Sequence, residues 1–138
     1  KVTGCLDGTN NRIDVTNNSN YPVTVDMSFK KEEGRFNTVT TDTSVRGVFN
    51  SDKDALATNI NGSSASACGI VGTPSINLAS ADTDDKYTGT GTGHADINNG
   101  KTSVTMYFGL WGIPDKDKAQ KDGAKAGTIT VSVKPYQK

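Results

Sequence analysis

Three segments of the sequence alternate between apolar and polar residues, and this alternation constrains the fold more than any other feature. The segments are 23–29, 102–110 and 128–136. Successive side chains of a β-strand point to opposite faces of the sheet, so a period of two predicts strands with one apolar and one polar face. Such strands are typical of antiparallel sheets that are packed on one side and solvated on the other. The sequence therefore predicts an all-β, antiparallel fold.

The apolar face of each segment is expected to point into the core. The expected inward residues are Val23, Val25, Met27 and Phe29 in the first segment, Val104, Met106, Phe108 and Leu110 in the second, and Ile129, Val131 and Val133 in the third. Polar residues occupy most of the positions between them and are expected to face solvent.

Four shorter segments, 12–15, 38–41, 44–49 and 75–79, are further strand candidates, and turns rich in Asn, Asp and Gly separate the candidates. About seven short strands in a chain of this length predict one immunoglobulin-like β-sandwich domain spanning residues 1–138. A partly open barrel is the alternative architecture.

Two stretches do not fit the strand pattern. Residues 51–67 mix charged residues with Ala and Ser, and they hold either a helical turn around 54–58 or a loop. Residues 115–126 are charged and lack an apolar face, which predicts a long exposed connection.

The charge and hydropathy of the chain disfavour two classes of partner. Its 15 basic and 15 acidic side chains give a formal net charge of zero, so no global field would concentrate nucleic acid. No apolar run approaches the roughly 18 residues of a membrane span. The first residues, Lys1 to Cys5, contain no signal-peptide core, so we expect a mature form without membrane insertion.

Cys5 and Cys68 are the only cysteines, and together with the single histidine they are too few for an ordinary tetrahedral zinc site. We predict a disulfide between them, and closing so long a loop contributes about 4 kcal/mol in the chain-entropy model. Such a bond indicates export through an oxidising compartment. The alternative is two buried thiols. Two N-x-S sequons, at Asn17 and Asn61, are relevant only in a eukaryotic host.

The sequence offers no set of residues with the pattern of an active site or a metal centre. His94 is the only histidine, and its spacing from acidic residues and serines selects no triad. The glycine-rich run at 89–93 lacks the spacing of a phosphate-binding loop. Asp82, Asp84 and Asp85 form an acidic cluster without the EF-hand pattern. We therefore expect no catalytic residue, no metal and no cofactor.

Tyr107 and Trp111 lie in the most aromatic stretch of the chain. Aromatic side chains at the end of a strand can stack on a sugar or anchor a partner, which makes these two residues a candidate ligand surface. A packed core tryptophan is the alternative interpretation of Trp111.

The C-terminal third carries a succession of features: an Asn-Asn-Gly turn at 98–100, a strand ending near Phe108, a variable hairpin, Ala126-Gly127, and an alternating strand that closes in Tyr136-Gln137. This succession resembles the end of chaperone-usher pilins, the subunits of bacterial fimbriae. Two features differ from the pilin pattern. Only Lys1 to Gly4 precede Cys5, where pilins carry an alternating donor strand, and the two cysteines lie farther apart than is usual.

The resemblance implies an incomplete immunoglobulin-like fold whose open groove accepts a strand from the neighbouring subunit. Ile129, Val131 and Val133 would line that donor-strand groove, and Tyr136 would match the family's penultimate tyrosine. The partners implied are neighbouring subunits, a periplasmic chaperone and a host receptor or glycan.

The function predicted from the sequence is that of a non-enzymatic subunit of a bacterial surface fibre, acting in assembly and adhesion at the cell surface. The alternative is a secreted binding module or effector that recognises a glycan or a host protein. An enzyme or enzyme inhibitor of unrecognised type is the third hypothesis.

Overall fold

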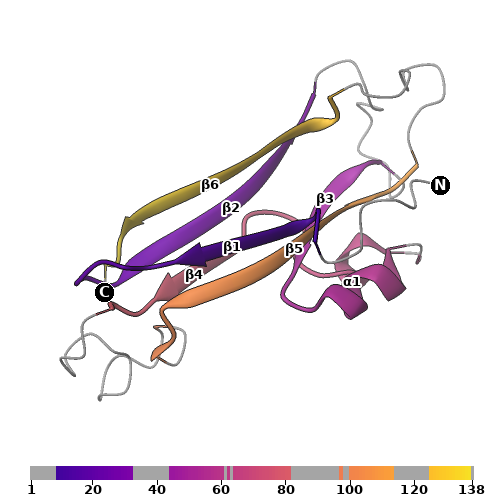
Figure 1. Cartoon of the computed structure of the whole chain (residues 1–138). Helices are drawn as coiled ribbons and strands as arrows, with labels where there is room; N and C mark the ends of the chain where they lie inside the picture. Colours follow the sequence, from indigo (N-terminus) through magenta and orange to yellow (C-terminus); the bar gives the residue numbers. More distant parts are fainter. Residues whose placement is uncertain are drawn as a thin grey trace. The chain divides into compact units, whose positions relative to one another are not determined.

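The computed structural model describes residues 9–32, 44–60, 62, 64–81, 97, 100–113 and 125–137. Strands dominate this part of the chain (Figure 1). Its elements in chain order are β1 (Arg12–Thr16), β2 (Val23–Lys31), β3 (Arg46–Asn50), α1 (Lys53–Asn59), the 3-10 turn η1 (Ala65–Ala67), β4 (Ser75–Leu78), β5 (Ser103–Trp111) and β6 (Gly127–Pro135).

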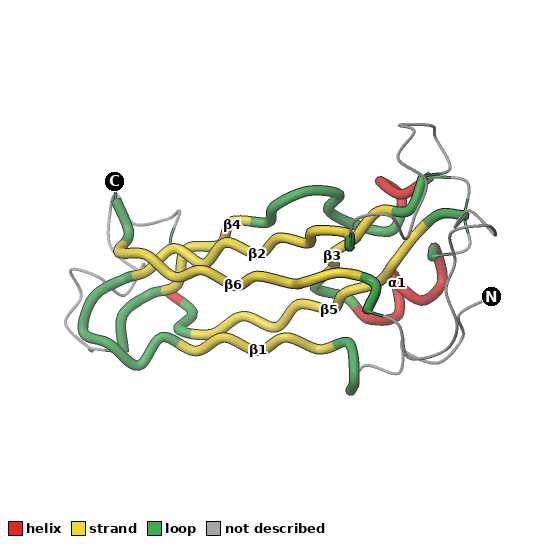
Figure 2. Tube along the Cα trace, turned by 90° about the horizontal axis from the view of Figure 1, so that it is seen from above, coloured by secondary structure: helices red, strands yellow, loops and turns green. Residues whose placement is uncertain are grey.

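The strands form two antiparallel sheets of three strands each. One sheet has the order β1-β5-β3, and the other has the order β4-β2-β6 (Figure 2). In the first, Phe49 of β3 lies opposite Phe108 of β5. In the second, Val25 of β2 lies opposite Ile76 of β4. The prediction of a mainly antiparallel β fold is therefore confirmed.

The three strongly alternating segments form β2, β5 and β6. The shorter candidates at 12–15, 44–49 and 75–79 correspond to β1, β3 and β4, whereas the candidate at 38–41 lies outside the described residues, as does most of the expected connection at 115–126. The single-domain prediction for residues 1–138 is not tested by these elements.

Residues 51–67, for which the sequence left a helical turn or a loop as alternatives, contain α1, so the helical alternative is the correct one. The Asp52 carboxylate caps the helix, accepting hydrogen bonds from the backbone N–H groups of Asp54 (2.9 Å) and Ala55 (3.2 Å). An N-cap of this kind satisfies donors that the first turn leaves without partners. Leu56 is fully buried, so packing on one side stabilises a helix too short to persist alone.

The backbone divides into two compact units, each assembled from separate segments. Unit 1 contains residues 1–12, 28–73 and 106–130, and unit 2 contains residues 13–27, 74–105 and 131–138. The strands β1, β2, β5 and β6 each contribute residues to both units.

In unit 1, one face of the sheet around β3 and β5 is covered by α1 and η1, both of which contact β3. The buried cluster on this face consists of Val48, Leu56, Ala65, Cys68 and Trp111, with Ile60 and Tyr107 packed against it. This covering layer, which we call the helical cover, explains why apolar residues occur on both faces of β5.

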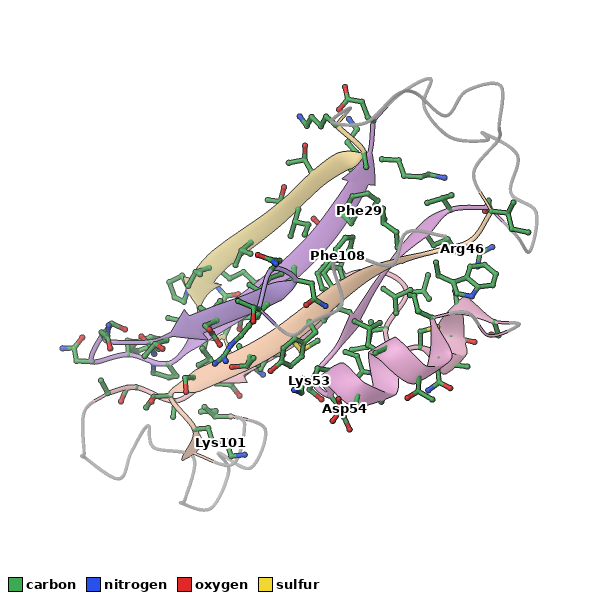
Figure 3. All side chains as sticks on the ribbon, turned by 45° about the vertical axis from the view of Figure 1, so that its right-hand side comes forward. Phe29, Arg46, Lys53, Asp54, Lys101 and Phe108 are labelled. Carbon is green, nitrogen blue, oxygen red and sulfur yellow. The ribbon has the colours of Figure 1, made fainter. Side chains whose placement is uncertain are left out.

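On the other face of β5 in unit 1, the Phe108 ring packs in a cluster with two further phenylalanine rings. Between ring centroids, Phe108 lies 5.0 Å from Phe29 of β2, and both rings are labelled in Figure 3. Phe108 also lies 5.2 Å from Phe49 of β3. Gly47 fits against this cluster because a Cβ there would lie 2.7 Å from both Phe29 and Phe108. A larger residue at position 47 would displace at least one ring.

Unit 2 has a smaller cluster of Ala79, Ile97 and Tyr136. Beside it, the buried Asn17 side chain donates to the carbonyls of Tyr21 (2.8 Å) and Ala79 (2.9 Å). Its Oδ1 accepts from the Ser19 backbone N–H and hydroxyl. Because both amide hydrogens are used and the residue is buried, the folded chain does not present the Asn17 sequon for modification. Asn61 lies outside the described residues.

Candidate functional site

The final strand, β6, is the element whose exposure departs most from the sequence-based expectation. Ile129, Val131 and Val133 are expected to pack inward, yet their exposed fractions are 38%, 39% and 56%. Every residue from Thr128 to Pro135 is exposed. The core prediction for these three residues is wrong because no described segment covers the apolar face of β6.

The position of β6 in its sheet adds a second open surface. Within the described strands it has one neighbour, β2, and stands at the end of the order β4-β2-β6 (Figure 2). The backbone groups that point away from β2 therefore have no described strand to pair with. An edge strand with an exposed apolar row is a template for pairing with another chain.

Contacts at both ends hold β6 against β2, although both faces of β6 are exposed. At the start of β6, the Glu32 backbone N–H donates to the Ala126 carbonyl (2.9 Å), and Lys125 pairs with the Glu32 carboxylate (3.7 Å). Just after its end, the Tyr136 backbone N–H donates to the Pro22 carbonyl (2.9 Å). The strand is thus a fixed element of the sheet.

Gly127 permits the close approach of β6 to β2. A Cβ at this position would collide with the Lys30 carbonyl oxygen and with the Phe29 ring. A side chain here would have to push the start of β6 away from β2, which relates the Ala126-Gly127 pair of the sequence to strand placement.

An ion pair fixes β6 further along. Lys134 lies 3.1 Å from the Asp26 carboxylate of β2. Hydrogen bonds from Ser75 and Lys134 lower the pKa of Asp26 below its usual value of 3.8, so the carboxylate stays charged into acid.

The two aromatic candidates, Tyr107 and Trp111, are packed beneath the helical cover. Trp111 is 6% exposed, and its indole N–H donates to the Gly62 carbonyl (3.0 Å). Tyr107 packs against the same cluster and is partly buried. Trp111 is therefore a packed core residue, as the alternative interpretation predicted. Neither Trp111 nor Tyr107 presents an exposed ring to which a ligand could bind.

At the far end of β5, Leu110 was expected inward but is 39% exposed. It occupies the opposite face of the strand from Trp111 and lies opposite Gly47 in the register. The inward expectation fails because the phenylalanine cluster ends at Phe108, one step short of Leu110 on that face.

Of the two cysteines, only Cys68 lies in the described part of the chain. It is fully buried in the cluster with Trp111, and its thiol donates to the Asn59 carbonyl (3.0 Å). Burial raises the pKa of this thiol, so it is held in its neutral form. Cys5 lies outside the described residues, so the disulfide stays a prediction.

The remaining sequence candidates are His94, Asp82, Asp84 and Asp85, and all four lie outside the described residues. In the part of the chain that is described, no three His, Cys, Asp or Glu side chains gather as metal ligands would. A search of the same residues for a helix of membrane-spanning length and hydropathy found none.

A groove that the sequence did not predict lies in unit 1. It has a volume of about 630 Å³ and is lined by Ser28, Phe29, Lys30, Lys31, Ser44, Val45, Arg46, Gly47, Val71, Gly72 and Thr73. Three of these residues are cationic and none is acidic. They come from β2, from β3 and the two residues before it, and from the segment before β4. Nothing in the local sequence pattern links positions so far apart.

Comparison of the chain with protein-family models, curated proteins and solved structures found no match in any of the three. The candidate function therefore rests on the residues of this chain alone.

Proposed function

We propose that this chain is a non-enzymatic subunit of a bacterial surface fibre of the chaperone-usher type, acting in assembly and adhesion. The observation that carries the proposal is the exposed apolar row of Ile129, Val131 and Val133 on an edge strand. A strand added beside β6 would pair with its open backbone groups and cover this row with alternate side chains.

The energetics favour covering this strand. Fully burying a Val or Ile side chain contributes about 1.5–3 kcal/mol relative to leaving it in water, and these three are only partly shielded. Added to several backbone hydrogen bonds of about 1 kcal/mol each, the gain exceeds what an isolated surface contact provides. A subunit with this open strand is expected to associate or to need a chaperone before assembly.

We further propose that the two sheets belong to an immunoglobulin-like sandwich that lacks one strand. The contact between Phe29 and Phe108 supports this architecture, because it joins a residue of β2 in one sheet to a residue of β5 in the other within unit 1. The same proposal includes the Cys5–Cys68 disulfide and export through an oxidising compartment to the cell surface.

The proposal is tested by native mass spectrometry and thermal melting of the oxidised protein, with and without a peptide of alternating apolar residues. We expect the peptide to form a one-to-one complex and to raise the melting temperature, because it binds the folded chain alone. The variant Val131→Lys should abolish the response, since it places a charge in the apolar row.

The matched control is Ser132→Lys, which adds the same charge to the opposite face of the same strand. It should keep the response to the peptide. A monomer whose melting temperature is unchanged by the peptide would contradict the proposal, as would equal loss of response in both variants.

A further inference from the structure

Backbone hydrogen bonds at both ends of β6 define how it is aligned with β2. The Tyr136 N–H donates to the Pro22 carbonyl (2.9 Å). The Glu32 N–H donates to the Ala126 carbonyl (2.9 Å). The two bonds lie ten residues apart on both chain segments, so β6 runs along β2 without the extra residue of a bulge. The pairing therefore alternates regularly from one end of β6 to the other.

This regular alternation shows which backbone groups of β6 face away from β2. The N–H and C=O groups of successive residues point to alternate sides of a strand. Those of Ala126 and Tyr136 point toward β2, so the even-numbered residues between them do the same. The N–H and C=O groups of Ile129, Val131 and Val133 therefore point away from β2, along the outer edge of the sheet.

The exposure of β6 is that of a strand with a neighbour on one side alone. All residues from Thr128 to Pro135 are exposed. In β2, which pairs with β4 on one side and β6 on the other, Lys30 is the single exposed residue. A segment lying along the outer edge of β6 would have reduced the exposure of β6 in the same way.

The side chains of the outward-pointing residues form the open flank of a buried face. Residues opposite one another in an antiparallel pair have side chains on the same face of the sheet. The alignment sets Val133 opposite Val25 and Val131 opposite Met27. Val25 and Met27 are fully buried, whereas Val131 and Val133 are 39% and 56% exposed. The buried face of this sheet thus ends in the apolar row of β6.

The strand is complementary to a second copy of itself. Let two β6 strands pair in antiparallel fashion about a two-fold axis at Val131. Ile129 of each copy then lies opposite Val133 of the other, and the two Val131 residues lie opposite each other. No other antiparallel alignment sets every member of the apolar row opposite another member. The outward-pointing residues form the hydrogen-bonded pairs of this ladder, so each uses both its N–H and its C=O group.

The charged residue and the proline of β6 are compatible with this alignment. Lys134, the one charged residue of β6, lies opposite Thr128 of the second copy and is paired with Asp26 of its own chain (3.1 Å). Parallel in-register pairing would instead bring two Lys134 side chains together, which is unfavourable. Pro135 lacks an N–H group, and it falls opposite Gly127 at the last pair, where the missing donor interrupts nothing beyond it.

We propose that β6 pairs with β6 of a second copy of this chain and forms a symmetric dimer. The two sheets join edge to edge in the order β4-β2-β6-β6-β2-β4. The apolar rows of the two copies then lie side by side on one face of the joined sheet and shield each other from water. Because the same surface of both copies meets itself, the contact closes with two chains.

The dimer shares the edge at β6 with the proposed function but does not require the fibre role. One edge accepts one strand, so self-pairing and the addition of a partner strand exclude each other. The dimer covers the edge until a partner strand displaces it. An interface confined to one strand of each chain is small, so we expect a dissociation constant in about the micromolar range.

The test measures the mass of the full chain by analytical ultracentrifugation from about 1 μM to about 1 mM, a range that brackets this affinity. We expect a reversible equilibrium between monomer and dimer. Val131→Glu sets two carboxylates at the two-fold axis and should weaken dimerisation by at least about tenfold. Thr128→Glu is the matched control, because it adds the same charge to the other face of β6, opposite Lys134 of the second copy. It should dimerise at least as tightly as the parent.

Disulfide trapping tests the alignment. In the proposed dimer, the Cα atoms of Ile129 and of Val133 in the other copy lie about 5.5 Å apart, within reach of a disulfide. A mixture of the Ile129→Cys and Val133→Cys variants should therefore give a cross-linked dimer on mild oxidation. Either variant alone should not, because identical positions in the two copies lie about 13 Å apart. The parent chain, oxidised in parallel, shows any background from Cys5 and Cys68.

Addition of the alternating apolar peptide separates this proposal from the proposed function. The peptide should convert the dimer into monomers that each hold one peptide. A chain that stays monomeric over the whole range and still binds the peptide would overturn the dimer and leave the proposed function standing. A monomer that does not bind the peptide would overturn both.

Two further results would overturn the dimer through β6. One is undiminished dimerisation of Val131→Glu, with circular dichroism and melting establishing that the variant folds, because the contact would then lie elsewhere. The other is equal cross-linking of the mixed and the single cysteine variants, which would contradict the two-fold axis at Val131.

Discussion

Strands β5 and β6 have similar alternating sequences but opposite surroundings. In unit 1, β5 has the phenylalanine cluster on one face and the helical cover on the other, so Met106 and Trp111 are both buried. In β6 every residue after Gly127 is exposed, including the apolar row. Alternation thus predicts that a strand forms, whereas burial depends on what the rest of the chain, or another chain, places against it.

The largest expected effect separates the two strands directly. Trp111→Ala should lower the free energy of unfolding by about 3–5 kcal/mol, because it removes a buried side chain from the helical cover cluster and leaves a cavity. Val133→Ala in β6 should change it by less than about 0.5 kcal/mol, because the residue is largely exposed. Urea unfolding at constant protein concentration measures both.

Comparable losses in the two variants would contradict the comparison, because they would mean that Val133 is packed in the isolated chain. Concentration dependence of the Val133→Ala result would show instead that a second copy covers β6.

The predicted disulfide would involve the buried cluster beneath the helical cover, since Cys68 is a member of that cluster. If Cys5 and Cys68 are joined, the intact mass of the protein is two hydrogens lower and neither cysteine reacts with iodoacetamide after unfolding. Reduction should then cost about 4 kcal/mol of stability. Alkylation of two cysteines in the unfolded, unreduced protein would instead support the alternative of two buried thiols.

Gly127 tests how β6 is placed against β2. Gly127→Ala should cost about 1–3 kcal/mol, because its Cβ meets the Lys30 carbonyl and the Phe29 ring and one of them must move. Gly72→Ala is a useful contrast, since a Cβ there meets nothing nearby and any cost comes from its positive φ of 140°. Differential scanning calorimetry of the two variants separates collision from backbone strain.

The smallest expected effect concerns the Asp26–Lys134 ion pair on β6. Because the pKa of Asp26 is lower in the folded chain than its usual 3.8, the charged carboxylate stabilises the fold above about pH 4. That contribution is lost as the pH falls below 3.8 through the folded value. Asp26→Asn should therefore flatten this part of the stability profile, measured by melting between neutral and acid pH. An unchanged acid-side slope would count against the pairing.

The sequence predicted the strands better than their surroundings. Alternation located β2, β5 and β6 because the period of two is a local property of the backbone. In the same pattern Tyr107 alternates with the residues that were expected inward, which places it on the face expected to meet solvent. The pattern could not reveal that α1 and η1 would cover that face. The helix itself was one of two interpretations, since Asp52 supplies a cap but the segment is short and has a single fully buried residue, Leu56.

Of the two candidate sites, one could be recognised in the sequence and the other could not. The apolar row at Ile129, Val131 and Val133 is visible in the sequence, although its exposure is not. The cationic groove was not foreseeable, because Lys31, Arg46 and Val71 come together only through the crossing of the chain before β4. Long-range arrangements of this kind depend on topology, which local patterns do not encode.

Hydrogen exchange of the β6 amides tests the central claim, that β6 is an open edge, most directly. In the isolated chain, alternate amides of β6 should exchange rapidly, because they point away from β2, while the amides of β5 stay protected by neighbours on both sides. Addition of the alternating apolar peptide should protect those β6 amides and leave β5 unchanged. Uniform protection along β6 before the peptide is added, in a monomer, would contradict the account.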